Sequence, residues 1–497
     1  MRERVTFVHA PDADVDPEAI NVQPAGLFGP SVDAVRQDRL TFGLDEVPVE
    51  LASLLRGHRA VHLRWTSPRK YDTLEPFGSR QSPGLHVSYT PAAPGVNDFS
   101  KLCEFLQKMG PVDCMAQEAF TAADTHQHAL PGSMFFHHQL EDLSTFVTIG
   151  LREICPELDS VCLSRLRSLH TAASLDISFD SADQALKIAA FWPLREHSLI
   201  VDASSTRRTE VGIFTKGSPP NLRPHEVGLG GVLNVLGEQK APSHVLFAAP
   251  SRHRLSGALF SSEFLKPAGL HPTLQLKLST NKPPVDNSDC APYAYLTLPK
   301  TIFADRYQFE DKLFLASKNL TASRYTTLPV DLEAPGYTTT TWGSNVLLEL
   351  APPEPSKEQA WTVQLPLHLR YLKPTASGYA RVEVPYPAVF WACESGGEGD
   401  FSTNPFDRRH LGYDELFSSE TTFWHAAPRP EVGNRIMSAI SVPVVKEEGA
   451  AWVHLGTTAA VSLGFAWVTW KLLTAWIGST AQGGKRERET SGQKKAK

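Results

Sequence analysis

The chain has 497 residues, of which 41% are hydrophobic and 21% charged, a composition that excludes wholesale disorder. Seven of the 48 basic and two of the 54 acidic side chains lie beyond residue 450, which leaves 41 basic and 52 acidic side chains before it. The resulting net charge of −11 for residues 1–450 disfavours nucleic acid as a partner. The 38 prolines occur along the whole chain and favour short strands and turns over long helices.

Residues 1–95 are predicted to form an N-terminal β-rich region. From Val61 to Trp65, apolar side chains alternate with His62 and Arg64. A two-residue period of this kind is typical of a strand with one buried and one solvated face. The proline- and glycine-rich stretch at 91–95 marks the end of the region.

Residues 96–260 are predicted to form a mixed, α+β middle region. A helix is predicted from a cap at Asn97 or Asp98 to Gly110-Pro111, because the apolar side chains between Phe99 and Leu106 share one of its faces. Residues 175–179 then alternate as a strand. A second helix is expected from Ser181, because Gln184 completes a capping-box pattern.

Residues 262–445 are predicted to be nearly all β. The longest alternating pattern runs from Val363 to Tyr371, with Pro366 within it. Proline lacks a backbone donor, so this strand is expected at a sheet edge or a bulge. Several such strands between proline and glycine turns indicate an antiparallel, sandwich-like domain.

A single transmembrane helix is predicted at residues 452–472. The nineteen residues from Trp452 to Trp470 carry no formal charge, and about 20 such residues span the hydrocarbon layer of a bilayer. Trp452 lies at one end of the segment, and Trp467, Trp470 and Trp476 gather at the other, as in an aromatic belt. The alternative is a buried core helix of a soluble domain.

The tail at 478–497 is predicted to be cytosolic, which places the N-terminal bulk of the chain in a lumen. It holds six basic residues against two glutamates, and positive charge favours the cytosolic side. Lys494 and Lys495 are fourth and third from the end, the dilysine pattern of endoplasmic-reticulum retrieval. Contact of the basic tail with anionic lipid is the alternative.

Two further features suit a lumenal body. The tripeptide that begins at Asn319 is the one glycosylation sequon of the chain. The six cysteines are too few for a disulfide scaffold, but some are able to pair in an oxidising lumen. Their spacing does not decide the partners.

The sequence provides no catalytic, cofactor-binding or metal site that we assign. The glycines between Gly228 and Gly231 lack the third glycine of a dinucleotide loop, so we predict a turn. A metal site built from the neighbouring histidines and one carboxylate is the weaker alternative to polar surface residues. These candidates are His126, His128, His137, His138 and Glu141.

The C-terminal domain resembles the PIG-X family. The resemblance begins at His271, includes PKTIFADRYQ from Pro299 and DLEAPGY from Asp331, and closes with PLHLRYLKPTASGYARVEVPYPAVFWAC from Pro366. The fungal form of the family also matches NPFDRRHLGYDELF from Asn404 and stretches of the first 95 residues. The resemblance spans most of the chain, and the middle region is its least distinctive part.

This resemblance implies an endoplasmic-reticulum membrane protein without catalytic residues of its own. Members stabilise the multi-span catalytic subunit, of PIG-M type, of glycosylphosphatidylinositol (GPI) mannosyltransferase I. That enzyme adds the first mannose to the GPI-anchor precursor from dolichol-phosphate-mannose. The fungal form is also linked to the folding of other lumenal proteins.

The resemblance also directs attention to particular residues. Cys290 and Cys393 both lie in the PIG-X-like domain, and we expect a disulfide between them. Gly456, Ala460 and Gly464 recur every four residues and form a small-residue ridge on which another helix could dock. No cofactor is expected.

Two other functions stay open at this point. One is a general lumenal chaperone or quality-control factor for endoplasmic-reticulum proteins. The other is a membrane-anchored hydrolase or transferase with its own site in the middle region.

Overall fold

The computed structural model describes residues 1–13, 15–93, 99–114, 117–122, 132–153, 155, 160–204, 207–223, 225–285, 289–328, 330–354, 357–394 and 401–493. The chain forms two compact units. The first comprises Met1–Tyr371 with Val382–Ile440, and the second Leu372–Arg381 with Ser441–Lys497. The fold is mainly β with one long C-terminal helix, which confirms the predicted fold class.

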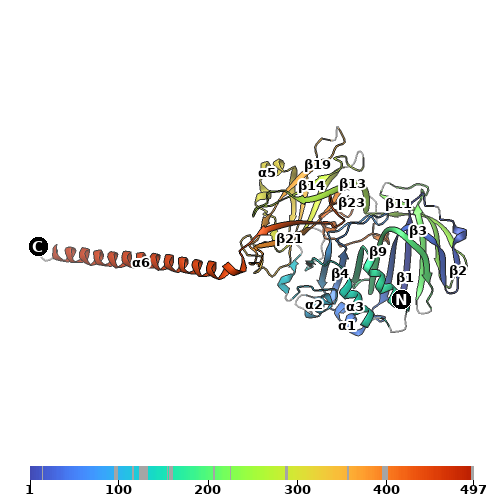
Figure 1. Ribbon diagram of the computed structural model, residues 1–497, viewed down its shortest axis with the longest axis horizontal. Coiled ribbons are helices and arrows are strands. Elements are labelled where there is room, and N and C mark those ends of the chain that lie inside the picture. Colours follow the sequence, from blue (N-terminus) through green and yellow to red (C-terminus); the bar gives the residue numbers. More distant parts are fainter. Residues whose placement is uncertain are drawn as a thin grey trace. The chain divides into compact units, whose positions relative to one another are not determined.

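A twelve-stranded sheet is built from the N-terminal half of the chain (Figure 1). Its order is β12-β11-β10-β1-β3-β9-β8-β4-β5-β7-β6, and β2 pairs with β3. Strands from both 1–95 and 96–260 therefore share this sheet. The strands are β1 (Arg2–His9), β2 (Asn21–Gln23), β3 (Gly26–Gly43), β4 (His58–Thr66), β5 (Gly84–Pro91), β6 (Thr121–Ala122), β7 (Met134–His138), β8 (Ser174–Asp180), β9 (Ala185–Asp202), β10 (Arg208–Lys216), β11 (Glu226–Val235) and β12 (Ser243–Pro250).

Short helices cover one face of this sheet. They are α1 (Val49–Arg56), α2 (Phe99–Gln107), α3 (Ser144–Glu153) and α4 (Ser160–Ser168). The helix predicted to end at Gly110-Pro111 is confirmed as α2, although it already ends at Gln107, and its Leu102 and Leu106 are fully buried. They pack with Val61, Leu63 and Trp65 of β4 in one hydrophobic cluster.

The strand β4 departs from the prediction of one solvated face. His62 and Arg64, on the face away from the helices, are only 8% and 6% exposed. The strand was expected to be half buried because its two faces differ in polarity. Both faces are covered in the folded protein, and the polar one faces other polar side chains rather than water.

Two local predictions in the middle region are wrong. No helix begins at Ser181, because residues 181–184 form the turn between β8 and β9, with Gln184 at φ 51°. The glycines at 228–231 lie within β11 and not in a turn. A Cβ atom on Gly231 would come 2.1 Å from the carbonyl oxygen of Ile213, so this glycine allows close approach of β10.

A second sheet of eight strands follows, in the order β17-β18-β15-β22-β23-β13-β14-β19. The strand at 361–366 is an edge strand, as predicted, but the predicted run to Tyr371 is divided at Pro366, and residues 368–369 pair in another sheet. The strands are β13 (His253–Phe264), β14 (Thr273–Leu278), β15 (Cys290–Pro299), β17 (Leu320–Thr326), β18 (Gly343–Leu350), β19 (Trp361–Pro366), β22 (Ala388–Glu394) and β23 (Thr421–Pro428). The helix α5 (Lys312–Ser317) precedes β17.

Two small sheets complete the strand pairing of the described residues. In one, β16 (Ile302–Phe303) pairs with β20 (His368–Leu369). In the other, β21 (Tyr379–Pro385) pairs with β24 (Met437–Pro443), directly before the C-terminal helix.

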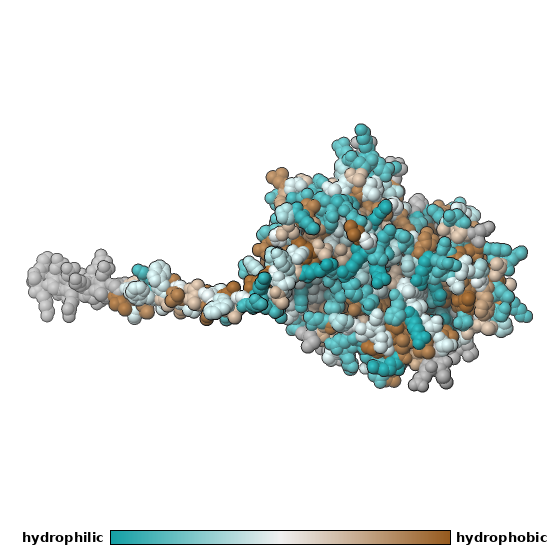
Figure 2. Space-filling view, viewed as in Figure 1, coloured by the Kyte–Doolittle hydropathy of each residue, from teal (hydrophilic) through white to brown (hydrophobic). Residues whose placement is uncertain are grey.

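The C-terminal helix α6 (Glu447–Gln493) is long and apolar enough to cross a membrane. The candidate span is Glu447–Ile477, with a mean hydropathy of 1.3 and no buried part. Trp452 and Trp476 are 76% and 66% exposed. Figure 2 shows hydrophobic side chains along the surface of this helix. The alternative of a buried core helix is therefore wrong.

Candidate functional site

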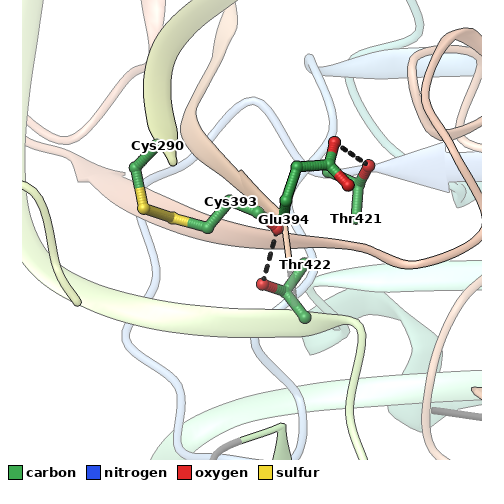
Figure 3. The surroundings of a disulfide bond; sticks show 5 residues. All are labelled: Cys290, Cys393, Glu394, Thr421 and Thr422. Carbon is green, nitrogen blue, oxygen red and sulfur yellow. Dashed lines mark hydrogen bonds between the residues drawn. A yellow bond between two sulfur atoms is a disulfide. The ribbon is translucent and has the colours of Figure 1, made fainter. Parts of the chain in front are cut away.

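The disulfide Cys290–Cys393 joins two neighbouring strands of the second sheet (Figure 3). The two cysteines are directly opposite each other where β15 pairs with β22. Thr422 donates a hydrogen bond from its hydroxyl to the carbonyl oxygen of Cys393, at 3.2 Å, and ties β23 to the same point. The covalent bond therefore lies where three strands of the family-like domain meet.

The other four cysteines also pair. Cys103 is bonded to Cys114, and Cys155 to Cys162. All six cysteines of the chain are consequently in disulfides. Disulfides form and persist in oxidising compartments and are rare in the cytosol.

Asn319 lies in the exposed turn between α5 and β17. Its backbone is left-handed, with φ 58°, a conformation that asparagine tolerates well. The side-chain amide donates to the carbonyl oxygen of Thr362 at 2.8 Å. The sequon is thus at the surface of the first unit.

The predicted docking ridge lies on the exposed part of α6. A Cβ atom on Gly456 or on Gly464 would meet no atom within 4 Å, and Ala460 is exposed as well. The ridge is thus open for contact in the chain alone. Lys494 and Lys495, the proposed retrieval signal, lie outside the described residues.

The histidines considered for metal binding do not assemble in the part of the chain that the structure describes. His126 and His128 lie outside it. His137 is buried and its Nε2 donates to the carbonyl oxygen of Pro83 at 2.9 Å, while Glu141 forms an ion pair with Arg435. Among the described residues no three histidine, cysteine or acidic side chains are arranged to hold a metal ion.

The segment 401–417, which carries one of the sequence stretches behind the resemblance, lies between the two large sheets. Leu411 and Tyr413 pack with Phe390 of the second sheet in a buried aromatic cluster. The hydroxyl of Tyr413 donates to the carbonyl oxygen of Arg80, at 2.8 Å. The segment therefore connects the two halves of the first unit.

A buried ion-pair triad is formed where this segment meets the first sheet. Arg408 contacts both carboxylate oxygens of Asp176 at 2.7–2.9 Å. Arg64, opposite Asp176 in the pairing of β4 with β8, places its Nε 2.8 Å from the same carboxylate. The three side chains are only 7–15% exposed. The sequence prediction missed this triad, although two of its residues are polar positions of alternating strands.

Comparison with known proteins decides the family. A family model described as PIG-X / PBN1 matches residues 267–473. Protein PBN1 of Gibberella zeae is 56% identical over 480 residues, which cover 96% of this chain and 97% of that protein. The chain belongs to the PIG-X / PBN1 family. Further family members are the pbn1 proteins of Neurospora crassa, 45% identical, and Emericella nidulans, 37% identical, each over 95% of both chains.

Family membership supports the role related to GPI-anchor biosynthesis that the resemblance implied. The region matched by the PIG-X / PBN1 model contains every strand of the second sheet except β13, which precedes it in the chain. It also contains the candidate membrane span up to residue 473. The relatives match the chain over nearly its full length, so the first sheet is shared with them as well.

Buried histidines of this PIG-X / PBN1 chain predict a loss of stability in mild acid. Loss of contact with water lowers the pKa of His86 to about 4 and that of His425 to about 3, from 6.5. Below pH 6.5 the unfolded chain therefore binds more protons than the folded chain does. As a result, the free energy of unfolding falls as the pH drops through that value. Each histidine contributes a loss of about 1 kcal/mol between pH 6.5 and 5.5, or about 2 kcal/mol together.

Thermal unfolding of the detergent-solubilised chain at pH 6.5 and 5.5 measures this loss. The variant His86→Gln/His425→Gln should lose about 2 kcal/mol less over that interval than the unaltered chain. Burial raises the pKa of Asp407 to about 7, which acts in the opposite direction. This carboxyl is present in both proteins, so it cancels in the comparison. Equal losses in the two proteins would contradict the prediction.

Proposed function

We propose that this chain is the non-catalytic, stabilising subunit of GPI mannosyltransferase I, which adds the first mannose in GPI-anchor biosynthesis. The observation that carries the proposal is its membership of the PIG-X / PBN1 family over nearly its full length. Transfer of mannose from a lipid-linked donor requires a site at the membrane. A chain with one candidate span among its described residues supports an accessory role beside a multi-span enzyme of PIG-M type.

The chain is proposed to cross the endoplasmic-reticulum membrane once, with its N-terminus in the lumen. Three disulfides support an oxidising compartment for the first unit. The basic residues after the span support a cytosolic tail, in which Lys494 and Lys495 serve for retrieval.

Topology gives a direct prediction. Asn319 should carry an endoglycosidase-sensitive glycan that is absent from the variant Asn319→Gln, because the sequon is exposed on the proposed lumenal unit. A tag after Lys497 should be digested by protease added outside sealed microsomes, while the first unit stays protected. An unglycosylated chain together with a protected tag would contradict this topology.

The ridge of Gly456, Ala460 and Gly464 is proposed as the surface on which a helix of the catalytic subunit docks. Small residues allow helix backbones to approach closely in a membrane. The variant Gly456→Leu/Gly464→Leu should reduce co-purification of the mannosyltransferase about five-fold or more, since a packing loss on the order of 1 kcal/mol changes an association constant by that factor.

Ser462→Leu is the matched control, because position 462 is two residues from Ala460 and points to the opposite side of the helix. This variant should co-purify the enzyme as the unaltered chain does. If the double glycine variant retains the enzyme fully, the ridge is not the docking surface. The accessory role itself is tested separately, by whether the unaltered chain brings down the enzyme at all.

A further inference from the structure

A polar cleft of about 460 Å³ lies between the first sheet and the segment 402–410, apart from the proposed docking helix. Its floor is made by four adjacent strands of the first sheet, β3, β9, β8 and β4. Ligand pockets in proteins are commonly about 300–1,000 Å³. The cleft is therefore large enough for a ligand of the size of a phosphorylated sugar.

Side chains in register across the four strands form the floor. Arg39 is opposite Ala189, which is opposite Asp176, which is opposite Arg64. Lys187 is two residues from Ala189 on the same strand. Side chains two residues apart on a strand share one face, so Lys187 is on the floor of the cleft beside this row. The small Ala189 in the middle of the charged row leaves space between Arg39 and the Arg64–Asp176 pair.

The cationic side chains of the cleft exceed its anionic ones. Five basic residues line the cleft, and two of them, Arg64 and Arg408, form ion pairs with the same carboxylate, that of Asp176. Asp183 is held by Lys187 at 2.5 Å, and Asp180 is exposed and accepts from the backbone N–H of Ala182. Asp407 accepts from the backbone N–H of Arg252. The basic residues are Arg39, Arg64, Lys187, Arg408 and Arg409.

Several buried polar atoms around the cleft have no partner among the described residues. Nη1 of Arg64 is buried without an acceptor. Arg39 is half-buried, lines the same cleft and forms no hydrogen bond or ion pair with a described residue. The amide nitrogen of Asn404 is also buried without an acceptor, and the residue is 5% exposed. Neither ring nitrogen of His62, which is 8% exposed, has a partner, and one of the two is a donor in the neutral imidazole. A buried donor without an acceptor costs about 1–3 kcal/mol, so a group of them around one cleft points to an acceptor-rich ligand.

From this arrangement we propose that the cleft binds a phosphate group carried by a sugar-sized polyol. The fork of an arginine guanidinium matches phosphate oxygens in pairs, and Arg39 with Nη1 of Arg64 are available for this contact. The hydroxyl of Ser178 and the carboxylates of Asp180 and Asp183, which also line the cleft, are suited to the hydroxyl groups of the polyol. The source of the phosphate is a soluble sugar phosphate or the headgroup of a phosphoinositide lipid.

Calorimetric titration of the full chain in detergent micelles tests the proposal with three probes. They are inorganic phosphate, glucose 6-phosphate and nanodiscs that contain phosphatidylinositol in phosphatidylcholine, with nanodiscs of pure phosphatidylcholine as reference. Glucose 6-phosphate or phosphatidylinositol should bind, and more tightly than inorganic phosphate. Binding of glucose 6-phosphate alone identifies a soluble ligand, and binding of phosphatidylinositol alone identifies a lipid headgroup.

Arg39→Gln is the informative variant, because Arg39 is outside the buried triad and its loss is therefore expected to leave the fold intact. It should weaken binding about ten-fold or more, the expected effect of losing one charge-assisted contact. Arg152→Gln, at a side chain that is 74% exposed on α3, should change nothing. An unchanged thermal midpoint of both variants shows that they are folded.

Three outcomes would overturn the proposal. The first is that no probe binds at millimolar concentration, which would mean that the cleft contains only water. The second is an affinity for inorganic phosphate equal to that for whichever of glucose 6-phosphate and phosphatidylinositol binds, which would remove the polyol from the proposal. The third is binding that Arg39→Gln does not weaken. None of these outcomes bears on the accessory role, which co-purification tests.

Discussion

Replacing Cys290 and Cys393 with serine is expected to lower the free energy of unfolding of the first unit by about 4.7 kcal/mol. The two cysteines are 103 residues apart, so the disulfide closes a loop of about 100 residues in the unfolded chain. Closing a long loop removes more conformational entropy from the unfolded state than closing a short one. Chemical unfolding of the purified full chain, followed by tryptophan fluorescence, measures the change.

The disulfide Cys155–Cys162 provides a matched control. Its cysteines are only seven residues apart, and its loss is expected to cost about 2.5 kcal/mol. The double-serine variant at 155 and 162 should therefore be more stable than the one at 290 and 393 by about 2 kcal/mol. If the two variants are equally stable, loop length does not explain how the Cys290–Cys393 disulfide stabilises the protein.

The variant Asp176→Asn is expected to destabilise the first unit by about 3–5 kcal/mol. Asparagine keeps the shape of the side chain but removes the charge, which leaves Arg64 and Arg408 buried without their shared carboxylate. Removing one partner of a buried ion pair costs more than the pair contributes, because the other charge stays out of water. The same unfolding measurement reports the loss.

Arg435→Met is the control for this variant. Arg435 also contacts two carboxylates, those of Glu141 and Glu383, but its side chain is 38% exposed. Ion pairs near the surface contribute about 0–1 kcal/mol. A loss from Arg435→Met as large as that from Asp176→Asn would show that burial is not what makes the triad important.

The predictions from sequence were most accurate for elements that are decided by the pattern of neighbouring residues. The helix that begins at Phe99 and the edge position of the strand before Pro366 are confirmed, because the side chains that decide them are close in the sequence. The exposed C-terminal helix was predicted from length and polarity alone. In each case the deciding physical effect acts over a few residues.

The prediction was wrong where distant segments decide the structure. Gln184 fits a capping box, but pairing of β8 with β9 places it in a turn. The glycines of β11 suggested a turn, but they let β10 approach closely. The triad of Arg64, Asp176 and Arg408 joins residues from three distant parts of the chain. Its local sign was the polar side chains of β4, a strand that is buried on both faces.

Depletion of this chain, with the mannosyltransferase followed in the same membranes, tests the central claim most directly. The account predicts that the half-life of the catalytic subunit shortens and that transfer of the first mannose from dolichol-phosphate-mannose is lost, while its messenger RNA is unchanged. Unrelated multi-span enzymes of the endoplasmic reticulum should keep their levels, whereas a general chaperone would affect them too. An unchanged level of the catalytic subunit together with normal transfer of the first mannose would contradict the account.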